Sequence, residues 1–210
     1  VKKMIIKPEN QSVKELHKLM IGSIVPRPIA LVSTISKDNI YNLAPFSYFS
    51  GVCSNPPTIV FAPGRRGWDG EKKDTLVNIE NKKEFVVNLV SESFADKMVS
   101  CATDFEANVD EFSVSKLTPK KSKIVNPPLV LESKINLECK LNQIIEIGNG
   151  EIGSGFLVIG TIVLFHIDDA IFEKGKINLE KLMPIGRLAG DWYSKQLDRF
   201  EIKRQIKPEK

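Results

Sequence analysis

Short apolar stretches separated by turn residues run along most of the chain, a pattern that is typical of a β-protein. Residues 29–35 are the clearest example. They are mostly apolar and follow Pro26-Arg27-Pro28, where the prolines disfavour helix and favour an extended backbone. Residues 36–39 then form a polar turn. The same pattern predicts further strands at residues 40–44, 46–53, 58–62, 84–90, 129–132, 135–147 and 156–167.

Few segments carry a helical pattern. Ser12 and Glu15 match a capping box, and apolar residues follow them at helical spacing, so we expect a helix near the N-terminus. Asp74 is expected to cap a second helix, and Ser93 and Asp96 to open a third. These two helices are expected to end near residues 79 and 103, with a short fourth helix at residues 179–182 and polar loops at residues 64–73 and 104–128.

The number of short strands predicts a mainly β fold, a closed antiparallel barrel with a few short helices. The alternating helix–strand order of a parallel doubly wound sheet is absent over most of the chain. Residues 148–153, GNGEIG, match the dinucleotide-binding pattern, but an apolar strand follows them where that pattern requires a helix. Asn149-Gly150 instead predicts a tight type I′ turn in a β-hairpin.

The composition adds limits to this picture. With 210 residues, 42% of them hydrophobic and 27% charged, the chain is expected to form one globular domain over residues 1–210, not a disordered or fibrous chain. The net charge is only +4. The basic runs at residues 116–123 and 203–210 contain no aromatic residues of the kind that stack on nucleic-acid bases. We therefore expect a solvated loop and a frayed tail there, and no nucleic-acid partner.

Neither a membrane segment nor a metal site is expected. No apolar stretch reaches the length of about 20 residues that a bilayer requires, and the first residues lack the apolar region of a signal peptide. We expect an unexported protein of the cytoplasm, with no membrane association. Cys53, Cys101 and Cys139 form no C-x-x-C pair, and His17 and His166 are the only histidines. Buried, reduced thiols are the expected state of the cysteines.

The most specific signals lie between residues 25 and 75. The segments VPRPIALVST (25–34), NLAPFSYF (42–49), PP (56–57) and KDT (73–75) resemble the flavin reductase-like family. This is a family of FMN-binding split-barrel proteins that includes flavoredoxin and the reductases of two-component monooxygenases. The resemblance implies a Greek-key split β-barrel, a homodimer, and FMN near the subunit interface. Further matches at residues 110–112, 137–139, 166 and 184–188 extend it over about residues 20–193.

A basic loop before the second helix is the expected phosphate site. A helix N-terminus offers unpaired backbone N–H groups, and with the Thr75 hydroxyl and Lys73 nearby it can bind an anion. Asp74 would repel a phosphate, so its carboxylate is expected to turn inward as the helix cap. The residues alone allow an ordinary capped helix after a basic loop, and the resemblance favours the phosphate site. The other basic side chains of this loop are Arg65, Arg66 and Lys72.

Polar and small residues on neighbouring strands are expected to hold the rest of the flavin. In a plain barrel such groups would satisfy turns, each other or water. In the family, the matching strand positions line the flavin, with side chains and backbone N–H groups contacting the ribityl chain and the ring. The residues at these positions here are Thr34, Asn42, Ala44, Ser47 and Ser50.

Five further residues are candidates, and all of them except Arg187 have two interpretations. Arg27 suits either a ligand contact or a salt bridge in a dimer, and Arg187 is the cofactor-binding candidate of the C-terminal part. Trp192-Tyr193 could cover the flavin ring or pack in the dimer interface, which we favour. His166 is either a structural residue or a residue on the nicotinamide side of the flavin.

These observations predict an FMN-dependent oxidoreductase. NADH or NADPH would reduce the flavin, which would pass electrons to an acceptor such as free flavin, a ferric complex, oxygen or a partner oxygenase. Few catalytic side chains are expected, because the cofactor carries the chemistry. One alternative is a flavoredoxin-like electron carrier without its own turnover. Single-stranded nucleic-acid binding is disfavoured because no basic residue lies between Phe46 and Phe61.

Overall fold

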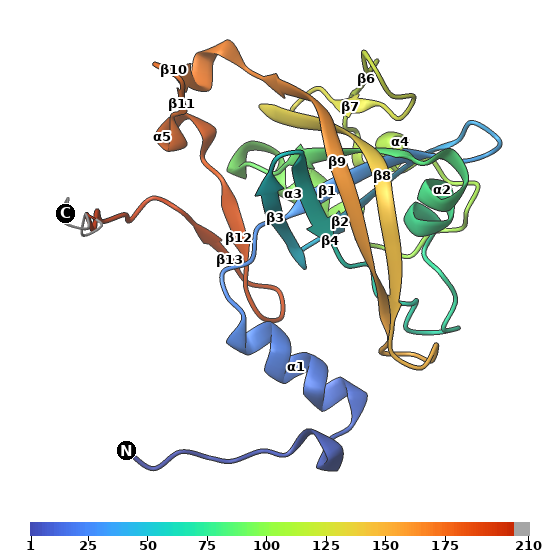
Figure 1. Cartoon of the computed structure of the whole chain (residues 1–210), viewed down its shortest axis with the longest axis vertical. Helices are drawn as coiled ribbons and strands as arrows, with labels where there is room; N and C mark the ends of the chain where they lie inside the picture. The colour runs from blue at the N-terminus through green and yellow to red at the C-terminus, as the bar shows by residue number, and fades with distance from the viewer. Residues whose placement is uncertain (204–210) are drawn as a thin grey trace.

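Seven antiparallel strands form the body of the molecule (Figure 1). The computed structural model describes residues 1–203. The strand order in the main sheet is β2-β1-β5-β8-β9-β4-β3. The strands are β1 (Ala30–Ile35), β2 (Tyr41–Phe46), β3 (Phe49–Ser54), β4 (Pro57–Phe61), β5 (Glu84–Leu89), β8 (Ile135–Ile147) and β9 (Gly155–Ile167). All the strands expected in this sheet are confirmed, with ends shifted by up to three residues.

The sheet curls into a barrel that is split rather than closed. The two edge strands, β2 and β3, are consecutive in the chain, yet within residues 1–203 they do not pair with each other. The expectation of full closure was therefore wrong, whereas the split β-barrel implied by the family resemblance is confirmed. Apolar patterns show that a strand exists, but they do not show which of its edges is hydrogen-bonded.

Both faces of β1 are buried, which explains its nearly continuous apolar sequence. Ala30 and Val32 face the barrel interior, where Leu76 and Ile79 of α2 (Asp74–Lys82) join them. Leu31 belongs to a second cluster on the opposite face, together with residues of α3 (Ala95–Ser100) and α4 (Glu111–Ser115). The core thus has two layers that share β1.

The N- and C-terminal segments both lie outside the barrel (Figure 1). The capping box of α1 (Val13–Ser23) is confirmed, since Ser12 N–H donates to Glu15 Oε2 at 2.8 Å and Glu15 N–H to Ser12 Oγ at 3.3 Å. The strands β12 (Ile185–Arg187) and β13 (Tyr193–Lys195) pair, and β12 also bonds to the backbone of Arg27.

The expected helix α5 (Leu179–Leu182) is confirmed. The smaller elements are η1 (Pro8–Asn10), η2 (Glu92–Phe94), η3 (Asp169–Ile171), β6 (Pro119–Lys120), β7 (Leu129–Val130), β10 (Phe172–Glu173) and β11 (Lys176–Ile177).

Two predicted helix starts were wrong. Lys73, not Asp74, is the N-cap of α2, and Asp74 is its first helical residue, without a capping hydrogen bond from its side chain. Its carboxylate interacts with the positive end of the helix dipole instead. Neither Ser93 nor Asp96 caps α3, because Ser93 lies in η2 and its hydroxyl bonds to that of Ser91 at 2.9 Å.

The expected loop at residues 104–128 contains secondary structure. Asp110 accepts a hydrogen bond from Phe112 N–H and caps α4, and β6 pairs with β7. The expected hairpin between β8 and β9 is confirmed, but its turn is longer than type I′. Gly148 and Gly150 have positive φ, whereas Asn149 does not, and a type I′ turn needs positive φ at both Asn149 and Gly150.

Two of the three cysteines are buried as expected, and all three are free. Burial raises the pKa of Cys101 to about 11 and moves that of Cys139 upward as well. Cys53 is exposed, against expectation, because the edge strand β3 is covered on neither face over most of its length.

In residues 1–203, no helix has the length and apolarity needed to cross a membrane. Of the expected basic tail, residues 204–210 lie outside the described residues.

The interior of the barrel leaves no room beside Gly160 on β9. A Cβ built there would lie 2.3 Å from Phe85 Cζ. We expect Gly160→Ala to lower the free energy of unfolding by about 1–3 kcal/mol through overpacking. Urea denaturation of this variant and of Gly51→Ala checks the prediction. A Cβ at Gly51 meets nothing within 4 Å, so that variant should stay within about 0.5 kcal/mol of the parent chain. Equal losses in the two would show that the contact with Phe85 is not the cause.

Candidate functional site

A groove follows β2 from the start of α2 to the β12–β13 hairpin. One cavity lies at the α2 end, and a second, at the hairpin end, is lined by Ser47, Arg187 and Tyr193. The two adjoin, because Pro45 and Ala102 line both. The α2 end is lined by Asn42, Ala44, Phe46, Arg66, Lys73, Asp74, Thr75 and Glu111, together with residues 101–105.

The unpaired edge of β2 forms one wall of this groove. Residues 43 and 45 direct their backbone groups away from β1, since alternate residues of an antiparallel strand bond to opposite sides. Leu43 N–H accordingly donates to Glu111 Oε2 at 3.1 Å. Pro45 has no N–H, and its position on an open edge leaves no donor unsatisfied. The carbonyl groups on this edge are available as acceptors for a ligand.

Two basic side chains lie at the α2 end, among the carboxyl groups of Asp74, Asp104 and Glu111. Lys73 Nζ lies 2.6 Å from Asp104 Oδ1. The buried Nε of Arg66 lies 3.7 Å from Asp69 Oδ2 and has no hydrogen-bond partner among the described residues. The first backbone N–H groups of α2 have no acceptor within the helix. An anion bound here would therefore find several donors.

The other two basic residues of the loop point elsewhere. Arg65 lies 5.0 Å from the centre of the Phe156 ring and pairs with Glu146, and Lys72 lies 5.4 Å from the same ring and pairs with Glu80. Neither lines the groove. Of the four basic residues expected near the phosphate, the structure brings Arg66 and Lys73 to the cavity.

A buried polar network connects the floor of the groove to α4. The Asn42 carboxamide oxygen accepts from the hydroxyls of Thr75 at 2.8 Å and Thr34 at 3.1 Å. Asn42 Nδ2 donates to Glu111 Oε1 at 2.8 Å. Asn78 Nδ2 donates to the Thr34 hydroxyl at 3.0 Å. Thr34 and Asn42 therefore lie under the cavity as parts of one network rather than as separate contacts.

Glu111 is the titratable centre of this network. Burial, together with the neighbouring Asp74 carboxylate, raises its pKa to about 7, against the opposing hydrogen bonds from Leu43 N–H and Asn42. A pKa in this range predicts that the carboxyl group, which lines the groove, changes its charge near neutral pH.

Arg27 is buried and makes all its contacts within the chain. Its Nη1 donates to the carbonyls of Ile21 and Ile24, its Nη2 to that of Leu188, and its Nε to Ser47 Oγ at 3.1 Å. Burial lowers the pKa of this guanidinium. Arg27 therefore joins the end of α1 to the C-terminal segment and fixes the Ser47 side chain.

The hairpin end of the groove carries a stacked pair. Arg187 lies over the Tyr193 ring, 4.5 Å from its centre, and both residues line the second cavity. Trp192 does not line it and is 75% exposed. Ser50 lies outside the groove on β3, where its exposed hydroxyl donates to the carbonyl of Gly51.

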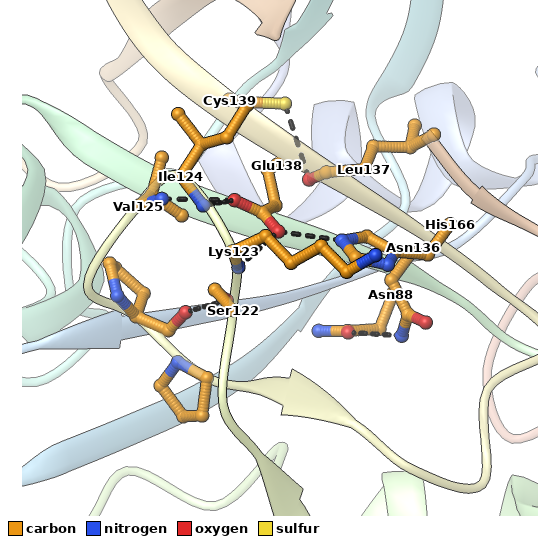
Figure 2. Close-up of polar contacts among 12 residues, drawn as sticks. Asn88, Ser122, Lys123, Ile124, Val125, Asn136, Leu137, Glu138, Cys139 and His166 are labelled. Carbon is orange, nitrogen blue, oxygen red and sulfur yellow. Dashed lines mark hydrogen bonds and ion pairs between the residues drawn. The ribbon is translucent and has the colours of Figure 1, made fainter. Parts of the chain in front are cut away.

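His166 lies in a different part of the barrel. Its Nε2 is 2.6 Å from Glu138 Oε1 (Figure 2), and the fully buried Glu138 also accepts from the backbone N–H groups of Lys123, Ile124 and Val125. Burial alone would raise the pKa of Glu138, but these hydrogen bonds outweigh it and hold the pKa below its ordinary value. His166 lines a separate surface cavity with Lys120 and Lys134, which shares no residue with the groove.

Sequence reasoning missed the role of Glu111 and the segment 101–105. Glu111 lies in the block 110–112 that matched the family, but nothing in that block showed that its carboxylate bonds to β2. Residues 101–105 carry no motif, and they reach the groove because of the position of α3. Only the signal from the family block could have pointed to Glu111.

The fold is a split barrel, and an elongated groove along β2 has the basic side chains of Arg66 and Lys73 at one end. The sequence model of the flavin reductase like domain matches residues 21–182. The chain belongs to the flavin reductase-like family, and this membership implies a flavin cofactor.

Solved structures agree with this assignment. Nitrilotriacetate monooxygenase component B from Bacillus cereus is 39% identical, with a TM-score of 0.92 over 96% of this chain and 100% of that one. The 2-nitrobenzoate 2-nitroreductase NbaA from Pseudomonas fluorescens is 29% identical, with a TM-score of 0.86 over 96% of each chain. A protein from Shewanella frigidimarina described as a candidate flavin reductase with a split barrel domain shares the fold at 20% identity, with a TM-score of 0.82 over 97% of this chain and 100% of that one.

The raised pKa of Glu111 predicts a pH dependence of stability. The folded chain holds a proton that the unfolded chain releases, so the free energy of unfolding should fall as the pH rises from about 4.5 to about 7. Glu111→Gln should flatten this part of the profile, because glutamine does not titrate. Urea denaturation between pH 4 and pH 8 measures the slope. The matched control, Glu9→Gln at an exposed site, should keep the parent slope, and an unchanged slope in Glu111→Gln would contradict the assignment.

Proposed function

We propose that this chain is an NAD(P)H-dependent flavin reductase that binds FMN in the groove along β2. The observation that carries the proposal is the continuity of this groove. It runs from Arg66 and Lys73 at the start of α2, past the open backbone edge of β2, to the Arg187–Tyr193 pair. An elongated cofactor with a phosphate at one end and a flat ring at the other matches that order of groups.

The α2 end fits a phosphate. Arg66 Nε is buried and lies 3.7 Å from Asp69 Oδ2, beyond hydrogen-bond distance, so a phosphate oxygen could supply the hydrogen bond that it lacks among the described residues. Lys73 and the first backbone N–H groups of α2 add positive charge and donors. A single terminal phosphate suits this arrangement, which supports FMN over FAD. Charge-assisted hydrogen bonds of this kind are the strong ones in proteins.

The remainder of the groove fits the ribityl chain and the ring. The Ser47 hydroxyl accepts a bond from Arg27, so its own proton can be donated to a ligand oxygen. The open carbonyls of β2 can accept from polar N–H groups of the ring, and Arg187 can contact its polar edge. Ala44 and Phe46 provide apolar contact beside these groups. When bound, the flavin supplies hydride acceptance and electron transfer, and the chain binds and orients it.

We also propose a homodimer in the cytoplasm. The helix α1 buries none of its residues, and it exposes Val13, Leu19 and Met20. Trp192 is exposed outside the groove. A second copy of the chain would cover these apolar surfaces. The electron acceptor on this proposal is free flavin or a partner oxygenase, by analogy with the component B protein.

A flavoredoxin-like electron carrier is the alternative, because it needs the same groove. An absorbance spectrum of the purified chain with FMN, taken before and after anaerobic addition of NADPH and then NADH, separates the two. The reductase proposal expects flavin bands near roughly 375 and 450 nm that bleach within seconds of adding either nucleotide. Bands that persist until dithionite is added would favour the carrier. Absence of bound flavin would contradict both.

The phosphate assignment has its own test. We expect the double variant Lys73→Gln/Thr75→Ala to bind FMN about 10- to 100-fold more weakly, because it loses charge-assisted hydrogen bonds worth about 1.5–3 kcal/mol. Its affinity for riboflavin, which has no phosphate, should stay nearly unchanged. Quenching of flavin fluorescence measures both affinities.

Lys82→Gln is the matched control. Lys82 lies in the last turn of the same helix and carries the same charge, but it is not part of the groove. This variant should bind FMN like the parent chain. Equal weakening of FMN and riboflavin by the double variant would show that the substitutions disturb the whole groove and not a phosphate site.

A further inference from the structure

We propose that Glu111 is a positioning residue that couples FMN binding to the uptake of one proton, by setting which way the Asn42 carboxamide points. This inference rests on the proposed FMN site. Glu111 lines the same cavity, but its hydrogen bonds go to β2, and its effect on the phosphate runs through Asn42 and Thr75.

The hydrogen bonds of the network all run in one direction. The hydroxyl of Thr75 and that of Thr34 both donate to Asn42 Oδ1, and Asn42 Nδ2 donates to Glu111 Oε1. Leu43 N–H donates to the other carboxylate oxygen. This arrangement is the one that an ionised Glu111 requires, because a carboxylate can only accept.

The ionised state is poorly suited to a phosphate. Thr75 has a single hydroxyl proton, and it is directed to Asn42, 2.8 Å away. Only oxygen lone pairs of Thr75 then remain for the cavity, and they repel a phosphate dianion. The carboxylates of Glu111 and Asp74, which both line the cavity, add to this repulsion.

A protonated Glu111 reverses the direction. One proton from solvent forms an O–H bond at Glu111 Oε1, and no electrons move. That O–H donates to Asn42 Oδ1 after the carboxamide turns over, while Glu111 Oε2 still accepts from Leu43 N–H. Asn42 Nδ2 then donates to Thr75 Oγ1, and the Thr75 proton is free for a phosphate oxygen. In this state the Thr34 hydroxyl no longer has Asn42 Oδ1 as its acceptor. The hydrogen bond from Thr75 to the phosphate must offset the cost of that loss.

The surroundings of Glu111 favour this switch near neutral pH. Asp74 of α2, Asp38 of the turn between β1 and β2, and Glu106 of the loop between α3 and α4 place negative charge beside the cavities that Glu111 lines. Lys37 and Arg66 also line these cavities. Cys101, at the end of α3, stays neutral because burial raises its pKa to about 11. Lys73 is paired with Asp104, and Tyr41 of β2 packs edge-on against Phe112. With a pKa of about 7, Glu111 takes up a proton at small cost when a dianion binds nearby.

The test compares FMN with riboflavin between pH 6.5 and pH 8.5, where the flavin phosphate is mainly a dianion. For the parent chain, the FMN affinity should fall at least about fivefold over this range, and the riboflavin affinity should not. Calorimetry at pH 7 in two buffers of different ionisation enthalpy should show uptake of about half a proton per FMN. FMN that binds without proton uptake would overturn the inference and leave the proposed function intact.

Glu111→Gln gives the decisive comparison. Its amide N–H donates to Asn42 Oδ1 at every pH, and its oxygen still accepts from Leu43 N–H, so the variant mimics the protonated state. We expect it to bind FMN at pH 8.5 about as tightly as the parent chain does at pH 6.5, with no proton uptake. A residue of merely structural importance would weaken binding instead, so a parent-like pH slope or a uniform loss of affinity in this variant contradicts the proposal.

A second variant keeps the proposal testable if Glu111→Gln does not fold. Thr75→Val removes the hydroxyl that transmits the change but keeps Glu111. It should bind FMN at pH 6.5 as weakly as the parent chain does at pH 8.5, and its riboflavin affinity should be unchanged. Retention of the full parent pH slope by this variant would also overturn the inference. Failure of every variant and of the parent chain to bind any flavin would instead contradict the proposed function.

Discussion

The unpaired edge of β2 is the constraint on which the site depends. A barrel that closed between β2 and β3 would use the backbone groups of residues 43 and 45 in the sheet. Because the barrel is split, one of these groups must be satisfied from outside, and the other residue is a proline with no N–H. Glu111 of α4 supplies the missing acceptor for Leu43. The same edge therefore provides an open wall for a ligand and buries a carboxylate beside it.

Two buried glutamates show how local donors decide the charge of a carboxyl group. Glu138 accepts from three backbone N–H groups and from His166, and these bonds keep its pKa low despite full burial. Glu111 has fewer donors and the Asp74 carboxylate as a neighbour, so burial dominates and its pKa rises to about 7. Glu138 therefore holds the loop at residues 123–125 in place, whereas Glu111 can change its charge beside the groove.

The sequence predicted most of the strands and the first helix, because these depend on local periodicity and capping. It placed Asn42, Ala44, Ser47, Lys73, Thr75 and Arg187 in the site, and the structure brings all six to one groove. It placed Asp74 at the N-cap position, which Lys73 occupies without a side-chain capping bond, and it included Ser50, which lies on the exposed β3. Local sequence does not show which residue adopts the extended cap conformation, nor which strand lies beside a groove.

The sequence by itself determined that this chain forms an antiparallel barrel of the flavin reductase-like type, because apolar alternation and the blocks around residues 25–75 are local properties. Only the tertiary structure decided that the barrel opens between β2 and β3, that Arg27 turns inward to hold Ser47, and that Glu111 reaches β2. Glu111 and Leu43 are 68 residues apart in the chain, and their contact depends on how α4 packs over the sheet. A side chain acquires its partner and its pKa from that packing, which no local pattern encodes.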